Sequence, residues 1–327
     1  MTDQMPLITI GMTCFNAADT IGRAIESAAA QDYPHFEILI VDDGSKDNSH
    51  DVIRAAIKDF PQARFIIHEV NTGFAGALNT IIKEAKGAFL AIFDDDDVSD
   101  PTRIRAQYER IVAYEKEFGA EKILCHVARM QTFENGLTRY EKTLGTEGGL
   151  APHGEIVARR VLYGDLGEYG LDLVGSCANC ARMGRIEIFR DLNGYDDSIR
   201  RGEDTDFSVR FALSGGHFVG IAEPLVHQYM TTGAEKTLDK EYYVERTFTE
   251  KHEADLKRWG WYGFALRWLD IRYANLHENY VKMLFLMALT FIQYPIKTIR
   301  KLIWSLPARD TRNSFKDWHL GKYNAAE

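Results

Sequence analysis

The feature that most constrains the fold is a regular alternation of short apolar runs and longer helical patterns in the first hundred residues. The apolar runs predict strands at residues 7–13, 36–41, 64–68 and 88–93. Strands that alternate with helices of this length are typical of an α/β fold, Rossmann-like, with a mostly parallel central sheet flanked by helices. The helices predicted from the spacing cover residues 17–31, 47–60 and 74–85, and a fourth begins at Pro101.

Polar residues gather where each of these predicted strands ends. The clusters are residues 13–16, 42–45, 71–73 and 94–97. In an open parallel sheet, ligands bind beyond the carboxyl ends of the strands. We therefore expect the four clusters to form a single ligand site at one edge of the sheet.

The fourth cluster is a run of four aspartates, Asp94 to Asp97. Four adjacent carboxylates repel one another, which raises their pKa values if nothing neutralises them. One interpretation is a solvated acidic loop that caps the next helix. The other is a site for Mg²⁺ or Mn²⁺, since these ions prefer carboxylate and phosphate oxygens. Asp94 and Asp96 point to the same side of an extended segment, so both can bind one ion.

A second acidic cluster follows the second predicted strand. The Asp43 carboxylate could accept hydrogen bonds from a base imide or from ribose hydroxyls, or it could belong to a simple turn. The sequence contains neither G-x-x-x-x-G-K-[ST] nor a G-x-G-x-x-G after the first strand. A nucleotide bound here would thus be held by carboxylates and a metal ion.

The composition excludes several classes of protein. The 327 residues carry a net charge of −9, which argues against non-specific binding of nucleic acid. Four cysteines are too few for a disulfide framework, and we expect reduced thiols. Cys177 and Cys180 precede a strand predicted at residues 181–189 and are assigned a packing role. We expect no signal peptide and no membrane-spanning helix, because no apolar run is long enough.

Taken in order, the motifs resemble those of the family 2 glycosyltransferases. The similarity covers about residues 6–230, and it implies a GT-A fold. It also implies metal-dependent, inverting transfer of a sugar from a nucleotide diphosphate sugar, with UDP as the favoured nucleotide. The motifs are Thr13-x-x-Asn16, Val41-Asp42-Asp43-Gly44-Ser45-x-Asp47, Asn71-x-Gly73-x-x-x-Ala77-x-Asn79, Phe93-Asp94-x-Asp96-Asp97-x-x-x-Pro101, Gly194-Tyr195-Asp196 and Gly202-Glu203-Asp204-Thr205-Asp206.

The resemblance assigns roles by position. It implies that Asp96 and Asp94 bind the metal ion, with His227 as a further metal or phosphate contact. Leu78 stands where the family often has an arginine, so the charge of the diphosphate must be neutralised from elsewhere or by the metal. The residues that we expect to bind the nucleotide are Thr13, Phe15, Asn16, Asp43, Asn71, Gly73, Asn79, Asp94 and Asp95.

Inverting transfer also needs a base on the acceptor side, because the attacking hydroxyl must lose its proton. The resemblance implies that Asp204 is this base, and Glu203 is the second residue of the predicted catalytic pair. Acidic residues are also common at helix N-termini, where they interact favourably with the helix dipole. Both interpretations can hold together, since a helix start would fix the direction of the carboxylate.

The predicted organisation has three parts: a nucleotide-sugar half at residues 1–105, an acceptor half at 106–235 and a helical extension at 236–327. The extension contains an apolar run at 283–292 and a basic amphipathic helix at 296–304. From Pro295 onward there are seven basic and three acidic residues. This pattern predicts membrane-surface contact through 281–304, although a helical hairpin packed on protein is an alternative.

From these features we expect a cytoplasmic enzyme, peripheral on the inner face of the membrane, that acts on a glycan or lipid-linked acceptor. One alternative is a non-catalytic nucleotide- or glycan-binding protein with this fold. A sugar-nucleotide pyrophosphorylase is less favoured, because residues 12–16 lack the Gly-rich basic loop of that class.

Overall fold

The computed structural model describes residues 5–167, 169–199, 201–230 and 237–306. The chain forms two compact units. The first consists of Met1–Glu155 and Gly175–Met230, and the second of Ile156–Val174 and Thr231–Glu327. The site predicted from the sequence lies within the first unit.

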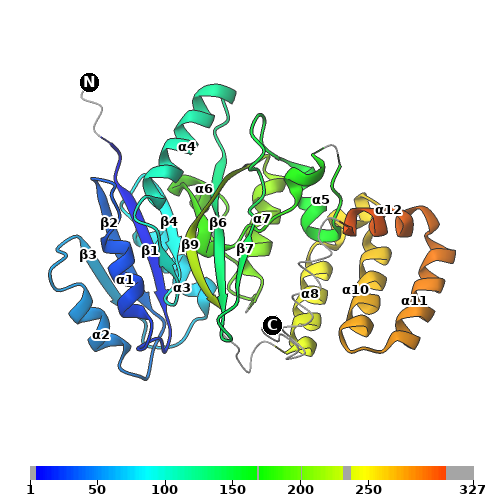
Figure 1. Cartoon of the computed structure of the whole chain (residues 1–327), viewed down its shortest axis with the longest axis horizontal. Helices are drawn as coiled ribbons and strands as arrows, with labels where there is room; N and C mark the ends of the chain where they lie inside the picture. Colours follow the sequence, from blue (N-terminus) through cyan, green and yellow to red (C-terminus); the bar gives the residue numbers. More distant parts are fainter. Residues whose placement is uncertain (1–4, 168, 200, 231–236, 307–327) are drawn as a thin grey trace. The chain divides into compact units, whose positions relative to one another are not determined.

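The predicted alternation of strands and helices is confirmed in the first hundred residues (Figure 1). All residues of the first and fourth strands are buried, as expected for strands with helices on both faces. The elements are β1 (Ile8–Cys14), α1 (Ile21–Ala29), β2 (Phe36–Asp42), α2 (Ser49–Ala56), β3 (Ala63–Ile67), α3 (Phe74–Glu84) and β4 (Phe89–Phe93).

The rest of the first unit extends this sheet with antiparallel and parallel pairs. The strand order is β3-β2-β1-β4-β8-β6-β9-β5, with β7 paired to β6. β1 is parallel to both β2 and β4, whereas β8 is antiparallel to β4 and β6. The added elements are β5 (Val98–Ser99), α4 (Arg103–Phe118), β6 (Ile123–Phe133), β7 (Thr138–Glu141), η2 (Asn179–Ala181), β8 (Arg182–Arg185), α6 (Ile186–Asp191), α7 (Glu203–Leu213) and β9 (His217–Met230).

The strand predicted at residues 181–189 is wrong in its second half. β8 ends at Arg185, and the next six residues form α6. Ile186, Ile188 and Phe189 are all buried on this short helix. Three apolar residues so close together fit a helical turn as well as a strand, so the periodicity did not distinguish the two.

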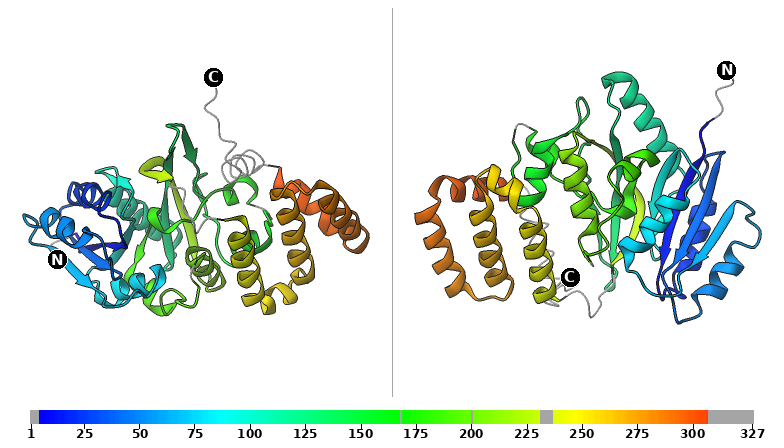
Figure 2. Two further views of the ribbon diagram at one scale, coloured as in Figure 1. Left: turned by 90° about the horizontal axis from the view of Figure 1, so that it is seen from below. Right: turned by 180° about the vertical axis from the view of Figure 1, so that it is seen from behind.

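The connectivity decides which helices cover each face of the sheet. Parallel crossovers are right-handed, so the successive steps from β1 to β2 to β3 put α1 and α2 on one face of the sheet. The step from β3 back to β4 runs in the opposite direction and puts α3 on the other face, visible in the two views of Figure 2. The loops that follow β1 and β4 meet at this edge of the sheet, where the N–H of Phe15 donates to Asp95 Oδ2 at 3.1 Å and Arg23 Nη2 donates to the backbone oxygen of Asp96 at 2.8 Å.

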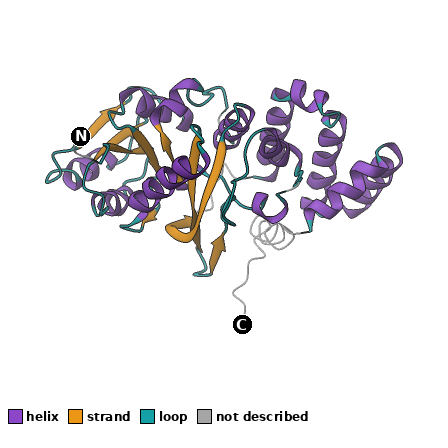
Figure 3. Ribbon diagram, turned by 90° about the horizontal axis from the view of Figure 1, so that it is seen from above, coloured by secondary structure: helices purple, strands orange, loops and turns teal. Residues whose placement is uncertain are grey.

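The second unit consists of helices, and its described residues contain no strand (Figure 3). The predicted C-terminal helical extension is confirmed. Its core contains Tyr163, Leu256, Trp261 and Phe264, with Trp304 packed against them. The helices are α5 (Glu155–Tyr163), η1 (Gly170–Leu173), α8 (Leu238–Lys251), α9 (Glu253–Arg258), α10 (Tyr262–Leu276), α11 (Tyr280–Gln293) and α12 (Pro295–Ser305).

Two histidines of the first unit are held neutral by burial. His126 is completely buried, its Nε2 accepts a hydrogen bond from Arg182 Nε at 3.1 Å, and burial lowers its pKa well below the usual value. Burial, with a contribution from His153, lowers the pKa of His217 to about 4. The ring of His217 stacks on that of His153, with centroids 4.3 Å apart.

These shifts predict acid destabilisation. An unfolded histidine takes up a proton near pH 6.5, whereas folded His217 does so only near pH 4. Its contribution to stability is therefore present above pH 6.5 and is lost as the pH falls toward 4. We expect the melting temperature to fall over this range, and less steeply for His217→Gln. Differential scanning fluorimetry with the exposed-residue control His35→Gln tests this. Equal slopes for the three proteins would contradict it.

Candidate active site

The run of aspartates forms the turn that follows β4. β4 is buried throughout, and β5, directly after the turn, pairs with β9. Within the described residues, Asp94 Oδ1 and Asp97 Oδ2 are buried without a hydrogen-bond partner. The other oxygen of Asp97 accepts a hydrogen bond from the backbone N–H of Tyr229 at 3.1 Å. The turn thus presents acidic oxygens that the surrounding protein leaves unsatisfied.

Burial and mutual repulsion of the carboxylates dominate the electrostatics of this turn. Burial and, to a smaller extent, repulsion by Asp96 together raise the pKa of Asp95 and of Asp97 to about 7. Burial raises the pKa of Asp94 well above its usual value, and the neighbouring aspartates add to this. A divalent cation would relieve both the repulsion and the unsatisfied oxygens. The donor set is therefore suited to the metal ion that the fold family implies.

The structure gathers a slightly different set of potential ligands from the predicted one. Asp94, Asp97 and Cys180 each offer an atom within 4.8 Å of the others, and this is the one such group of three among the described residues. Asp96 is not in it, although its charge acts on its three neighbours. His227 is exposed on β9, and its charge acts on Asp100. The metal roles of Asp96 and His227 stay predictions.

Cys180 is a residue of this site that the sequence analysis assigned only to packing. It is buried in η2, and Arg129 Nη1 and Gln228 Nε2 approach its sulfur at 3.6 and 3.7 Å. Arg129 also donates to Gln228 Oε1 at 2.7 Å. No spacing in the sequence indicates this, because the pairing of β6 with β9 and β8 brings the three residues together.

The second acidic group lies at the start of α7, close enough to interact with the first. Burial raises the pKa of Glu203 to about 7, with a further contribution from Asp204. The charge of Glu203 also helps to raise the pKa of Asp94. Asp204 Oδ1 accepts hydrogen bonds from its neighbour Thr205, from the backbone N–H at 2.6 Å and from Oγ1 at 3.1 Å. The two acidic groups predicted from the sequence therefore share one electrostatic environment.

Arg182 anchors the start of α7, and the sequence analysis did not identify it. Its side chain is completely buried. Nη2 donates to the backbone oxygen of Asp204 at 3.3 Å and to Ser208 Oγ at 2.8 Å, while Nη1 donates to the Tyr195 hydroxyl at 3.0 Å. The guanidinium thus links β8 to the helix turn that carries both predicted catalytic residues.

The loop after β1 provides the next predicted residues. Thr13 is buried in β1, Phe15 is about half exposed, and Asn16 has a positive φ of 51°. The side chain of Asn16 accepts a hydrogen bond from the Lys46 backbone N–H at 2.8 Å. The N–H of Phe15 donates to Asp95 Oδ2 at 3.1 Å, which joins this loop to the aspartate turn. Phe15 therefore presents an accessible ring beside the acidic cluster.

Asp43 stabilises the loop that contains residues 71–73. Its carboxylate accepts hydrogen bonds from Thr72 N–H and Oγ1, both at 2.8 Å, from Gly73 N–H at 2.7 Å and from His68 Nδ1 at 2.8 Å. Asn71 Nδ2 donates to the backbone oxygen of Asp43 at 3.1 Å. Burial opposes ionisation, but the hydrogen bonds lower the pKa of Asp43 below its usual value. Asp43, Asn71 and Gly73 are thus joined in one hydrogen-bonded cluster.

The side chain of Asn79 makes hydrogen bonds to the backbone of Tyr195. Its Oδ1 accepts from the N–H of Tyr195 at 2.7 Å, and its Nδ2 donates to the oxygen of the same residue at 2.8 Å. Gly194 lies so close that a Cβ there would be 2.2 Å from Asn79 Oδ1. A contact from Asn79 to a nucleotide would require these bonds to break, and this role stays a prediction.

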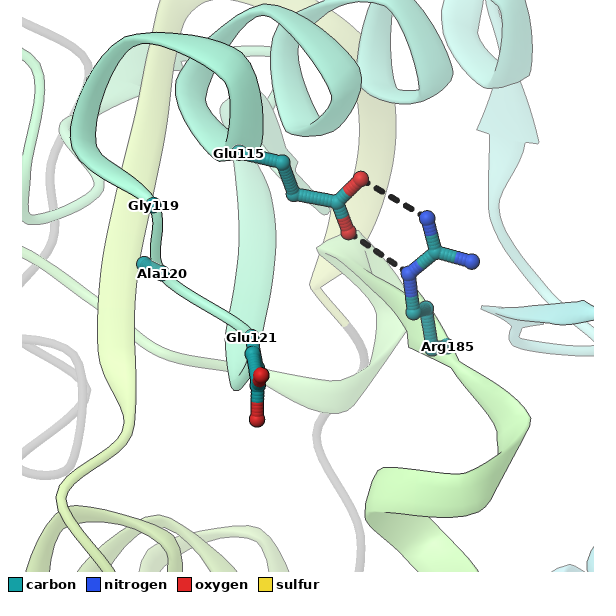
Figure 4. Close-up of a pocket in the computed structure, with 5 residues that line it drawn as sticks. All are labelled: Glu115, Gly119, Ala120, Glu121 and Arg185. Atoms are coloured by element: carbon teal, nitrogen blue, oxygen red, sulfur yellow. Dashed lines mark hydrogen bonds and ion pairs between the residues drawn. The ribbon is translucent and has the colours of Figure 1, made fainter.

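A separate pocket of about 360 Å³ lies away from this site (Figure 4). A bidentate ion pair forms part of its wall: Arg185 Nε and Nη2 donate to the two carboxylate oxygens of Glu115 at 2.6 and 2.7 Å. Arg185 pairs with Phe89, at the opposite end of β4 from the aspartates. The pocket contains none of the predicted site residues.

Comparison with known proteins gives a family match for the N-terminal part of the first unit. Residues 9–121 match the family model described as glycosyl transferase family 2. These residues, which we call the family 2 domain, are similar to the family 2 glycosyltransferases. The chain is 43% identical over 108 residues to the succinoglycan biosynthesis protein ExoO of Rhizobium meliloti, a match that covers 33% of this chain and 30% of ExoO.

A second relative is the UDP-Glc:alpha-D-GlcNAc-diphosphoundecaprenol beta-1,3-glucosyltransferase WfaP of Escherichia coli. It is 41% identical over 105 residues, which are 32% of this chain and 40% of WfaP. The family 2 domain is therefore similar to proteins of polysaccharide biosynthesis, although this chain spans well under half the length of either relative.

Solved structures extend the likeness to almost the whole chain. TarS 1–349 of S. aureus is 16% identical with a TM-score of 0.58, over 98% of this chain and 93% of TarS 1–349. The mannosyltransferase PcManGT from Pyrobaculum calidifontis, in complex with GDP-Man and Mn²⁺, is 14% identical with a TM-score of 0.57, over 98% and 85%. At these identities the likeness shows the fold alone. The predicted GT-A fold is confirmed.

The contacts of Asp43 predict that its carboxylate is a stabilising element of the site. Asp43→Asn replaces one accepting oxygen with a donor that faces the N–H groups of Thr72 and Gly73. We expect a loss of about 2–3 kcal/mol in the free energy of unfolding. The exposed Asp51→Asn, on the following helix, should change it by less than about 0.5 kcal/mol. Urea denaturation followed by circular dichroism measures both, and equal stabilities would contradict this role of Asp43.

Proposed function

We propose that the protein is a metal-dependent inverting glycosyltransferase that moves a sugar from a nucleotide diphosphate sugar to a hydroxyl of a glycan or lipid-linked acceptor. The observation that carries this proposal is the electrostatic interaction of two partly buried acidic groups, the aspartate turn and Glu203. The aspartate turn lies within the residues that match the family 2 model. One group suits a metal ion and the other suits a base, and the proposed reaction needs both.

Mg²⁺ or Mn²⁺ is the proposed cofactor. Asp94 and Asp96 would hold it, and the buried oxygen of Asp97 and the sulfur of Cys180 lie close to Asp94. When bound, the ion stabilises the negative charge that develops on the leaving diphosphate. This role has particular weight here because Leu78 replaces a basic residue that the family often has.

UDP is the favoured nucleotide. WfaP is named for UDP-Glc, TarS has been solved with UDP-GlcNAc, and PcManGT has been solved with GDP-Man. These proteins support a nucleotide sugar as the donor more firmly than they support one particular base. The proposed contacts come from β1 and the loops described above, and from Asn79 on α3. They are Thr13, Phe15, Asn16, Asp43, Asn71, Gly73, Asn79, Asp94 and Asp95.

Asp204 is the proposed base, with Glu203 beside it. It would take the proton of the acceptor hydroxyl as the oxygen attacks the anomeric carbon, while the bond to the diphosphate breaks. The buried Arg182 fixes the backbone at Asp204, so the direction of the carboxylate is set by the fold. In this assignment residues 1–105 bind the donor and residues 106–235 provide the acceptor side.

The proposed location is the cytoplasmic side of the membrane, with peripheral attachment. Among the described residues, no helix is both long and apolar enough to cross a bilayer. WfaP, a relative of the family 2 domain, is named for a diphosphoundecaprenol-linked acceptor. An acceptor of that kind would require the enzyme to work at a lipid surface, with contact through residues 281–304.

The first test is calorimetric titration of UDP, GDP, dTDP and CMP, each with and without Mn²⁺. We expect UDP to bind only in the presence of the metal, and Asp96→Asn to weaken that binding by at least about tenfold. Asp51→Asn serves as the matched control and should bind UDP with the affinity of the wild-type protein. Equal affinity without metal would contradict the metal role, and failure of the folded protein to bind any nucleotide would contradict the donor assignment.

The second test separates the base from the donor site. Asp204→Asn should lower turnover by about 10²–10⁴-fold and leave the affinity for UDP unchanged, because only the proton acceptor is removed. Turnover is measured as UDP release from UDP-glucose or UDP-N-acetylglucosamine. The assay uses an acceptor on which the wild-type protein is active. Near-normal turnover would remove Asp204 as the base, and loss in Glu203→Gln alone would assign that role to Glu203.

A further inference from the structure

The helix α12 is oriented with its polar side toward the protein and its apolar side toward solvent. Lys297 donates to the backbone oxygen of Gly260, and Lys301 donates to that of Tyr163 at 2.5 Å. Thr298, also on this side, is 1% exposed. In contrast, Ile296 and Ile303 are 68% and 58% exposed. A surface helix of a water-soluble protein has the opposite arrangement.

The preceding helix α11 adds a second exposed apolar stripe. Its inner side contacts α10, next to which it lies in Figure 1. Val281 and Ile292 are 83% and 77% exposed, and Leu284 and Phe285 between them are also exposed. These four residues have the spacing i, i+3, i+4 and i+11, so they lie on one side of the helix. Single exposed apolar residues are common, but two ordered stripes on consecutive helices mark an interaction surface.

We call these residues the apolar surface of the second unit. It consists of Val281, Leu284, Phe285, Leu289, Ile292, Ile296, Ile299, Leu302, Ile303 and Leu306.

The charges around this surface distinguish between possible partners. Residues 280–306 contain four basic residues and no acidic one. Lys282 and Arg300 are exposed, whereas the other two contact backbone oxygens. In a symmetric contact with a second copy, these cations would meet a surface whose own segment offers no carboxylate. Anionic lipid headgroups would supply the missing negative charge beside an apolar layer.

The lengths of the helices set the geometry of such a contact. α11 has 14 residues and α12 has 11. At 1.5 Å per residue the longer helix extends about 21 Å, which is short of the roughly 30 Å of a bilayer core. Neither helix can span the membrane, and each can only lie along its surface with the apolar side inserted.

We propose that the apolar surface of the second unit inserts into one leaflet of a lipid bilayer. The sequence pattern favoured a basic helix that binds anionic headgroups, but in the structure two of its lysines are half-buried and donate to backbone oxygens of the protein. The attachment is therefore mainly hydrophobic, with a smaller contribution from Lys282 and Arg300. The proposal deepens the membrane location given under the proposed function and does not depend on catalysis.

Flotation of the full chain with lipid vesicles tests the proposal. The vesicles are phosphatidylcholine alone and phosphatidylcholine with phosphatidylglycerol. We expect the protein to float with both, and more of it with the anionic lipid. The double variant Phe285→Ser/Ile303→Ser should lower the bound fraction several-fold on both vesicles. The matched control is Val70→Ser in the first unit, where Val70 is 73% exposed and outside this surface. Arg300→Gln should reduce only the extra binding to the anionic vesicles.

Each variant is first checked for an unchanged thermal melt and unchanged UDP binding, so a loss of flotation reports on the surface. Absence of flotation, or equal flotation of the double and control variants, would overturn the proposal. So would a lipid-free dimer in sedimentation that the double variant dissociates, because a second copy would then cover the surface. A protein that floats but binds no nucleotide would refute the proposed function and leave this inference intact.

Discussion

Four consecutive carboxyl groups follow β4, a strand whose residues are all buried, so their charges lie where ions are poorly solvated. Much of the first unit is arranged around this constraint. The completely buried Arg103 lies over the Phe93 ring at 4.1 Å and donates to the backbone oxygen of Ile92 at 2.8 Å. It thus brings positive charge beneath the turn, yet Asp94 and Asp97 still have unsatisfied oxygens. A cation above the turn would complete the balance of charge.

The same constraint explains why loops from distant parts of the sequence meet at this edge. The N–H of Phe15 binds Asp95, that of Tyr229 binds Asp97, and the Arg23 side chain binds the backbone oxygen of Asp96 at 2.8 Å. Each contact places a donor on an acidic turn that would otherwise repel itself. These contacts therefore order the neighbouring loops around the aspartate turn.

The candidate site divides into residues that the sequence could indicate and residues that it could not. Asp94, Asp96 and Asp204 stand at the ends or starts of elements with strong local signals, so order along the chain was enough to single them out. Cys180 and Arg182 carry no local signal. They reach the site because β8 inserts between β4 and β6, an antiparallel pairing that hydrophobic periodicity does not specify. The contact of Asn79 with Tyr195 joins residues 116 positions apart and was equally invisible.

The amino-acid sequence by itself determined the parallel half of the sheet, its helices and the acidic edge, because these depend on short-range periodicity and on the position of polar residues after each strand. Only the tertiary structure decided which face of α12 is exposed. An amphipathic pattern states that one side is apolar, but not which side the rest of the protein covers. Here the backbone oxygens of Gly260 and Tyr163 bind the lysines, and the isoleucines are left outside.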